Sequence, residues 1–106
     1  MKEIIEDPGV LGAVQFTPKG DLEAYKGRFS EAEARIAARM GASNATLMQM
    51  QCRLYADYSR QPEWMSFEGW VMLGPDRGIL VVGDTLCLLD PAKASINELI
   101  AALAEP

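Results

Sequence analysis

The chain has 106 residues, of which 49% are hydrophobic and 24% charged, a composition typical of one globular domain with a single core. Its 10 basic and 15 acidic residues give a formal charge of -5, which argues against nucleic acid because duplex-binding domains present a basic surface. The chain contains no histidine, so it lacks the commonest general base, the commonest zinc ligand and every Ser-His or Cys-His pair. We therefore expect a non-catalytic protein without a cofactor or a metal.

The first predicted elements are short. Residues 2–7 fit a lead-in helix of about two turns before Pro8. The next segment, 10–16, is apolar apart from Gln15 and predicts a strand buried on both faces. After a turn at 17–21, residues 22–26 alternate between apolar and charged side chains, which predicts a strand buried on one face only.

The dominant predicted element is a helix from Glu31 to Ser59. Ser30 and Glu33 form a capping-box pattern at its start, and helix-compatible residues continue up to Pro62. Such a helix would be about 43 Å long, whereas a compact domain of this size has a diameter of about 33 Å. We therefore expect that the helix either kinks near Gly41 or is covered partly by a second molecule.

Two apolar stripes run along this predicted helix, and we expect both to be buried in one wide arc. The first stripe comprises Ile36, Met40, Leu47, Met50 and Leu54. The second comprises Ala37, Gly41, Ala45, Met48, Cys52 and Tyr55. Because Ala37, Gly41 and Ala45 are small, we expect their spacing to let the backbone of a second molecule approach closely.

Three further strands and a closing helix complete the predicted order. The strands cover 67–73, 79–82 and 85–89; a turn at 74–78 separates the first two and a Gly-Asp pair separates the last two. A second capping-box pattern, Ser95 with Glu98, begins the closing helix. The continuous apolar runs place the first, fourth and fifth strands in the centre of the sheet, with the second and third at its edges.

The third strand would leave an unprotected apolar edge, which soluble proteins normally cover. Together with the long helix, this edge predicts a homodimer. The expected dimer interface comprises Ala37, Gly41, Ala45, Met48, Trp70, Val71, Met72 and Leu73.

The available chemistry favours binding over catalysis. Most aspartates border turns, where hydrogen bonds to the backbone explain them, and no glycine-rich phosphate loop is present. Cys52 and Cys87 lack a nearby second cysteine, so we expect buried free thiols and a reducing cytoplasm. The acidic start and the absence of a long apolar run predict neither a signal peptide nor a membrane partner.

Two functional hypotheses remain open at this point. The first is a dimeric cytoplasmic adaptor for a protein partner, which would contact the arginines along one helical face, Arg35, Arg39, Arg53 and Arg60. The second is a small-ligand sensor or an accessory subunit of a metabolic complex. Its pocket would be lined by Trp64, Phe67 and Trp70, although these aromatic residues also suit a core or an interface.

The segment from Pro8 to Leu22, with its PGV-x-G start, its first strand and its turn, resembles the opening of the roadblock/dynein-light-chain family. Lys19-Gly20 stands where that family usually has Asp-Gly. The long helix, the Trp70 strand and the Gly83-Asp84 hairpin extend the resemblance over residues 1–106 as one domain, closest to a stand-alone prokaryotic branch of unknown function.

The resemblance implies an α+β, profilin-like roadblock fold with the order α-β-β-α-β-β-β-α. A five-stranded antiparallel sheet would lie between the long helix on one face and two terminal helices on the other. It further implies dimers joined through third strands and long helices, and regulation or scaffolding of small Ras-like GTPases or motor complexes, without catalytic residues. Fold alone does not fix function, so the GTPase remains an implication of the resemblance.

Overall fold

The computed structural model describes residues 7–65 and 67–104. Their elements, in chain order, are β1 (Val10–Phe16), β2 (Leu22–Gly27), α2 (Glu31–Ser59), η1 (Pro62–Met65), β3 (Gly69–Leu73), β4 (Gly78–Val82), β5 (Thr85–Leu89) and α3 (Ile96–Ala104). Apart from Asp7, the predicted lead-in helix over residues 2–7 lies outside the described residues. The predicted order of the other elements is confirmed, and the single 3-10 turn η1 is an addition to it.

The five strands form one antiparallel sheet with the spatial order β2-β1-β5-β4-β3. This order confirms that the apolar strands β1, β5 and β4 are central and that β2 and β3 are the edges. The register of β1 against β5 shifts between Val10 and Gly12. This irregularity lets Val10 and Ala13 contribute to the same side of the sheet.

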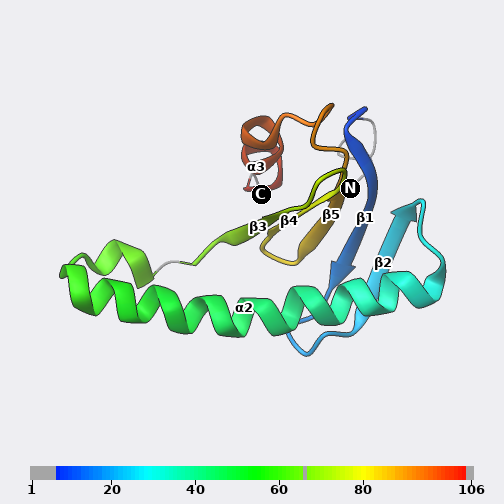
Figure 1. Ribbon diagram of the computed structural model, residues 1–106. Helices are drawn as coiled ribbons and strands as arrows, with labels where there is room; N and C mark the ends of the chain where they lie inside the picture. The colour runs from blue at the N-terminus through cyan, green and yellow to red at the C-terminus, as the bar shows by residue number, and fades with distance from the viewer. Residues whose placement is uncertain (1–6, 66, 105–106) are drawn as a thin grey trace.

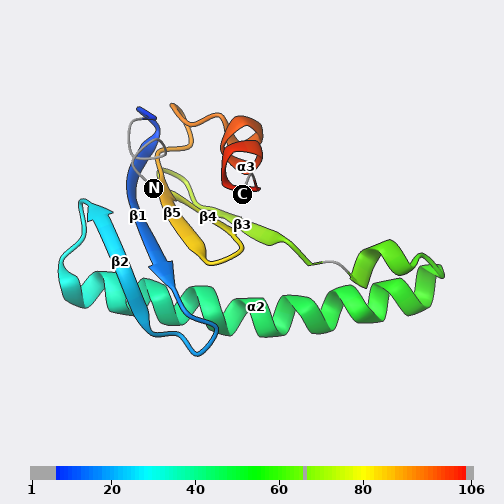
Figure 2. The ribbon, with the colours of Figure 1, turned by 180° about the vertical axis from the view of Figure 1, so that it is seen from behind.

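The two helices cover opposite faces of the sheet (Figures 1 and 2). On the α2 face, the alanines of the helix pack against bulky strand residues, Val14, Phe16, Trp70, Val81 and Leu86. On the α3 face, Leu99 packs against Val10, Ala13, Leu80, Cys87 and Leu89. The predicted layers, with the long helix on one side and the closing helix on the other, are therefore confirmed for the described residues.

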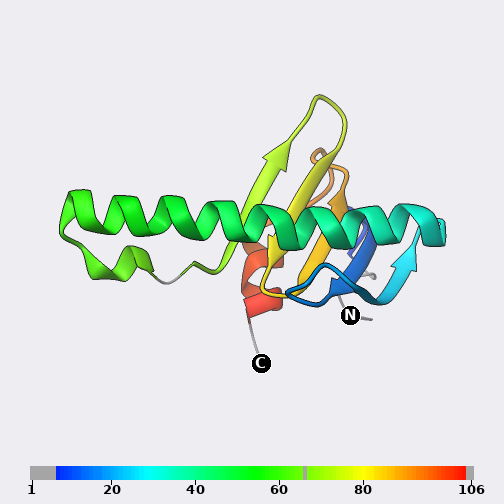
Figure 3. The ribbon, with the colours of Figure 1, turned by 90° about the horizontal axis from the view of Figure 1, so that it is seen from below.

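The long helix α2 has the predicted bounds and runs without interruption past Gly41. Its capping box is formed: the Glu33 amide donates to Ser30 Oγ over 3.1 Å, and the Ser30 amide donates to Glu33 Oε1 over 3.2 Å. The longest dimension of the molecule is 42 Å. As Figure 3 shows, α2 crosses the whole sheet and continues well beyond the edge strand β3.

The closing helix α3 begins at Ile96, as its apolar pattern predicts, but its second capping box is not formed. The amide of Leu99 donates to the main-chain oxygen of Ser95 over 3.0 Å. Over residues 7–65 and 67–104, neither Ser95 nor Glu98 makes a side-chain hydrogen bond. The pattern therefore located the helix start correctly and its capping bonds incorrectly.

Candidate interaction surfaces

The edge strand β3 sends its side chains alternately to the two faces of the sheet, and this separates the residues expected at a dimer interface. Trp70 points into the core beneath α2 and is only 8% exposed. Its neighbour Val71 points to the other face and is 40% exposed, and Met72 and Leu73 are more exposed still. Trp70 thus contributes to the core of its own chain, while the next three residues form an open apolar edge.

The small-residue stripe of α2 also packs within the chain. Ala37 and Gly41 are buried, and a Cβ placed on Gly41 would lie 2.5 Å from the ring of Phe16 in β1. The close approach expected at Ala37, Gly41 and Ala45 is therefore made to the chain's own sheet. Ala45 and Met48 are half-buried farther along the same side.

The first apolar stripe of α2 is placed differently from our expectation of burial. Ile36, Leu47, Met50 and Leu54 are at least half exposed, and Met40 is half-buried. These residues lie on the opposite side of α2 from the buried alanines, since their helical positions are about half a turn away. Of the two stripes, the sheet covers the small one, and the stripe of large residues faces solvent.

The part of α2 beyond β3, together with η1, carries a group of exposed aromatic residues; we call residues 50–65 the overhang. Trp64 in η1 packs edge-on against Tyr55, with ring centroids 4.7 Å apart, and its Nε1 donates to Gln61 Oε1 over 3.2 Å. Tyr58 is 87% exposed. Tyrosine, tryptophan and methionine are enriched at protein interfaces, so the overhang has the composition of a contact surface.

The four arginines expected to contact a partner are all exposed. Arg35 lies 3.7 Å from Glu31 in an ion pair one helical turn apart. Arg60 follows the end of α2 in a left-handed conformation, with φ of 60°. Arg35 and Arg53 share one flank of the helix and Arg39 lies close to it in angle, whereas Arg60 lies beyond the helix and outside this spacing.

The three aromatic residues expected to line one ligand pocket lie in different places. Trp70 borders a hollow of about 220 Å³ between α3 and the β3 side of the sheet. Phe67 borders a second hollow, beside Leu103, and Trp64 packs on Tyr55 at the overhang. The two hollows adjoin, since Glu68 and Val82 line both, so Trp64 alone lies apart and the three residues do not line one common pocket.

The titratable groups offer little that resembles a catalytic centre. Cys52 and Cys87 are free thiols, and burial raises the pKa of Cys87 to about 12, which keeps it protonated at neutral pH. Within residues 7–65 and 67–104, no three His, Cys, Asp or Glu side chains gather as metal ligands. None of the helices in that part of the chain has the length and hydropathy to cross a membrane.

Comparison with known proteins identifies the fold. MglB of Myxococcus xanthus superposes with a TM-score of 0.75 at 14% identity, over 95% of this chain and 82% of that one. The gliding protein MglB of Thermus thermophilus gives 0.72 at 18% identity, over 97% and 84%. A roadblock/LC7 domain from Streptomyces avermitilis gives 0.72 at 18% identity, over 97% and 87%. The expected roadblock fold is thereby confirmed.

The sequence comparisons place the chain in a family. A search among curated proteins gave no match. A family model described as "Uncharacterized conserved protein (DUF2173)" matches residues 1–105, nearly the whole chain. The protein therefore belongs to the DUF2173 family and has the roadblock/LC7 fold.

Proposed function

We propose that this chain is a non-catalytic, homodimeric module that binds a protein partner and regulates or scaffolds it. The roadblock resemblance supplies the class of partner, small Ras-like GTPases. One observation carries the proposal. The helix α2 spans the sheet and continues past β3 (Figure 3), so the large apolar residues of the overhang do not pack on the sheet of the same chain and remain exposed.

The open edge of β3 supports a dimer in which two β3 strands pair. The sheet ends at β3, whose outer side has no neighbouring strand within the described part of the chain. Such an edge presents free N–H and C=O groups, and here its exposed side chains, Val71, Met72 and Leu73, are apolar. A second copy related by a two-fold axis would extend the sheet across this edge and bring its own strands beneath the overhang.

The same two-fold dimer would cover a second apolar area. Near the 74–77 turn a hollow of about 350 Å³ is lined by Met72, Ile79 and Leu88. Met72 shares the α2 face with Trp70, yet the β3–β4 hairpin extends beyond the helix (Figure 3). In a two-fold dimer the overhang of the second copy would lie over this part of the sheet. One contact would then bury Tyr55, on the sheet-facing side of the overhang, together with Met72.

The arginines of α2 support a protein partner. The chain carries a net charge of -5, but Arg35, Arg39 and Arg53 lie along the helix on a side that the sheet does not cover. Arginine is favoured at protein interfaces because its planar guanidinium binds carboxylates through two hydrogen bonds. An acidic surface on the partner would complement this face.

Light scattering tests the dimer. The purified chain at micromolar concentration is expected to have twice the 11.6 kDa mass of one chain. Val71→Asp at the edge and Tyr55→Glu on the overhang should each shift the mass towards 11.6 kDa, whereas Ala101→Asp, on the exposed side of α3, should leave the dimer intact. A wild-type chain that stays at 11.6 kDa would disprove the dimer.

Affinity capture from the source organism tests the partner class. Any Ras-like protein recovered should hydrolyse GTP at a different rate when the wild-type chain is added. Arg39→Glu combined with Arg53→Glu should abolish that effect, while the matched charge reversals at the exposed Lys26 and Lys93 should preserve it. Recovery of no GTPase would reject this partner class and leave the dimer to be judged by its mass.

A further inference from the structure

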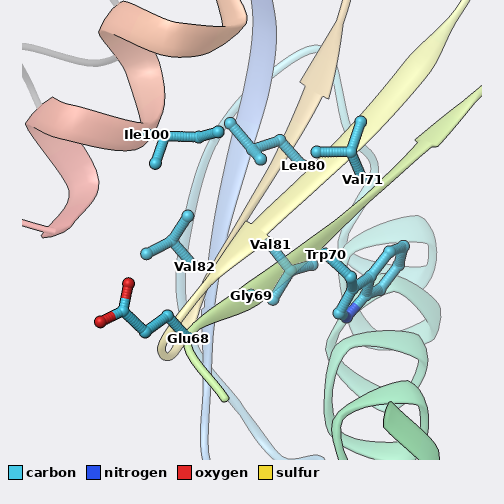
Figure 4. A pocket seen from close by; sticks show the side chains of 8 residues that line it. All are labelled: Glu68, Gly69, Trp70, Val71, Leu80, Val81, Val82 and Ile100. Atoms are coloured by element: carbon cyan, nitrogen blue, oxygen red, sulfur yellow. The ribbon is translucent and has the colours of Figure 1, made fainter. Parts of the chain in front are cut away.

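Among residues 7–65 and 67–104, the α3 face of the sheet is covered only in part. Leu99 anchors α3 over β1, β5 and β4, and the helix packs chiefly against β4. Between α3 and β3 the sheet is left open, and Figure 4 shows Ile100 of α3 facing Leu80 and Val71 across a hollow of about 220 Å³. Val71 is accordingly exposed on this face.

A second hollow of about 290 Å³ continues the first one. Glu68 and Val82 line both, and the second adds Phe67 from the chain before β3 and Leu103 from the end of α3. The two hollows together form an elongated groove beside α3, which we call the α3 groove. Its walls are α3 on one side and the β3 side of the sheet on the other.

The charge in the α3 groove is concentrated at one residue. Among the residues that the structure describes, Glu68 is the only ionisable side chain that lines either hollow, and it stands at the end of the first hollow (Figure 4). Within residues 7–65 and 67–104, Glu68 has no basic side chain within 4.0 Å. The groove therefore presents apolar walls on both sides of one unpaired carboxylate.

We infer that the α3 groove binds a short segment of a partner protein in which apolar side chains flank a lysine or an arginine. The apolar side chains would fill the two hollows, and the cation would pair with Glu68 between them. This inference rests on the proposed role as a protein-binding module. Val71 belongs both to the β3 edge and to the groove wall, so the proposed dimer interface would border the groove.

A random-peptide selection on the full-length chain provides the probe. Enriched peptides are expected to share a lysine or arginine between apolar residues, and one of them, labelled with fluorescein, is then titrated by fluorescence anisotropy. Glu68→Lys and Ile100→Glu should each weaken its binding by about tenfold or more, because the first reverses the charge and the second introduces a charge into an apolar wall. Replacing the basic residue of the peptide by glutamate should restore binding to the Glu68→Lys chain.

A matched control separates the groove from general charge effects. Glu98→Lys makes the same charge change on an exposed residue of α3 that lines neither hollow, and it should leave peptide affinity unchanged. Light scattering of Glu68→Lys should return the wild-type mass, so loss of peptide binding is distinguished from loss of the dimer. The inference is overturned if no peptide is enriched, if the enriched peptides lack a basic residue, or if Glu68→Lys binds them as the wild type does.

Discussion

The two faces of the sheet are packed by helices of different character. On the α2 face the strands supply the bulk, with Phe16 and Trp70, and the helix supplies alanines and Gly41. On the α3 face the helix supplies a large residue, Leu99, which packs on strand residues of mixed size, from Ala13 and Cys87 to Leu80 and Leu89. Small helix residues let α2 lie close to the strands along its path, and nothing comparable brings α3 down onto β3.

Helix length explains the rest of the difference. α2 has 29 residues and crosses all five strands, whereas α3 has nine, and within the described part of the chain the β3 side of its face is uncovered. Each face therefore has a different surplus: the α2 face has more helix than sheet, and the α3 face has more sheet than helix. The first surplus points to a second copy of the chain, and the second to a smaller occupant.

The largest loss of stability is expected at Trp70 of β3, and its neighbour Val71 provides the comparison. Trp70→Asp would remove a large buried side chain, at about 3–5 kcal/mol, and leave an unpaired carboxylate in the α2-face core, which together approach the whole stability of a small domain. We expect loss of cooperative thermal unfolding by circular dichroism.

Val71→Asp is the matched control for this experiment, since it places the same carboxylate on the other, exposed side of the strand. Measured at a concentration where the chain is monomeric, it should retain a cooperative transition close to that of the wild type. Equal behaviour of the two variants would contradict the assignment of Trp70 to the core and Val71 to the surface.

The next effect concerns the close approach of α2 to the sheet. Leucine at position 41 would drive a side chain into the ring of Phe16, and overpacking of this kind typically costs about 1–3 kcal/mol. The better helix propensity of leucine offsets about 1 kcal/mol of that cost. We expect Gly41→Leu to lower the free energy of unfolding in urea by up to about 2 kcal/mol.

Ser43→Leu provides the comparison, because Ser43 is exposed on the side of α2 away from the sheet. Its free energy of unfolding should stay within about 0.5 kcal/mol of the wild type. If both leucines were tolerated equally, α2 would not pack as closely on β1 as described.

Local signals predicted most of the fold. The bonds of the Ser30–Glu33 capping box and the Gly83-Asp84 turn depend on neighbouring residues, so the bounds of α2 and of β5 could be read directly from the sequence. The apolar runs of β1, β4 and β5 required cover on both faces, which identified the three central strands and left β2 and β3 as the edges. By contrast, the box at Ser95 shows that a matching pattern need not form its side-chain bonds.

The interaction surfaces were less predictable because hydrophobicity does not distinguish a core from an interface. Both stripes of α2 are apolar, and only the size of the facing strand residues decides which one the sheet covers. The run Ala34, Ala37, Ala38, Gly41 and Ala42 was the available signal, because bulky residues such as Phe16 and Trp70 leave room for small partners only. Side-chain alternation likewise left open which of Trp70 and Val71 points inward.

A smaller effect concerns the α3 face and depends on pH. Burial raises the pKa of the Cys87 thiol from 9.0 to about 12, so the folded chain retains a proton that the unfolded chain releases. The contribution of this buried thiol to the free energy of unfolding is complete below pH 9 and is lost as pH rises towards 12. Between pH 8 and pH 10 the wild type should lose about 1.4 kcal/mol more than Cys87→Ala, measured by urea unfolding at each pH. Parallel pH profiles for the two chains would show that Cys87 is accessible to water.

The smallest effect compares how the helices of the two faces begin. At the start of α2 the Ser30 hydroxyl accepts from the Glu33 amide, and removing such a cap usually costs about 1 kcal/mol. At the start of α3 the bond from Leu99 goes to the main-chain oxygen of Ser95, which alanine also provides. We therefore expect Ser30→Ala to lower the free energy of unfolding by about 1 kcal/mol and Ser95→Ala by less than about 0.5 kcal/mol in the same urea experiment. Equal losses would mean that Ser95 caps α3 through its side chain after all, so that both helices would be fixed at their starts in the same way and only their lengths would distinguish the two faces.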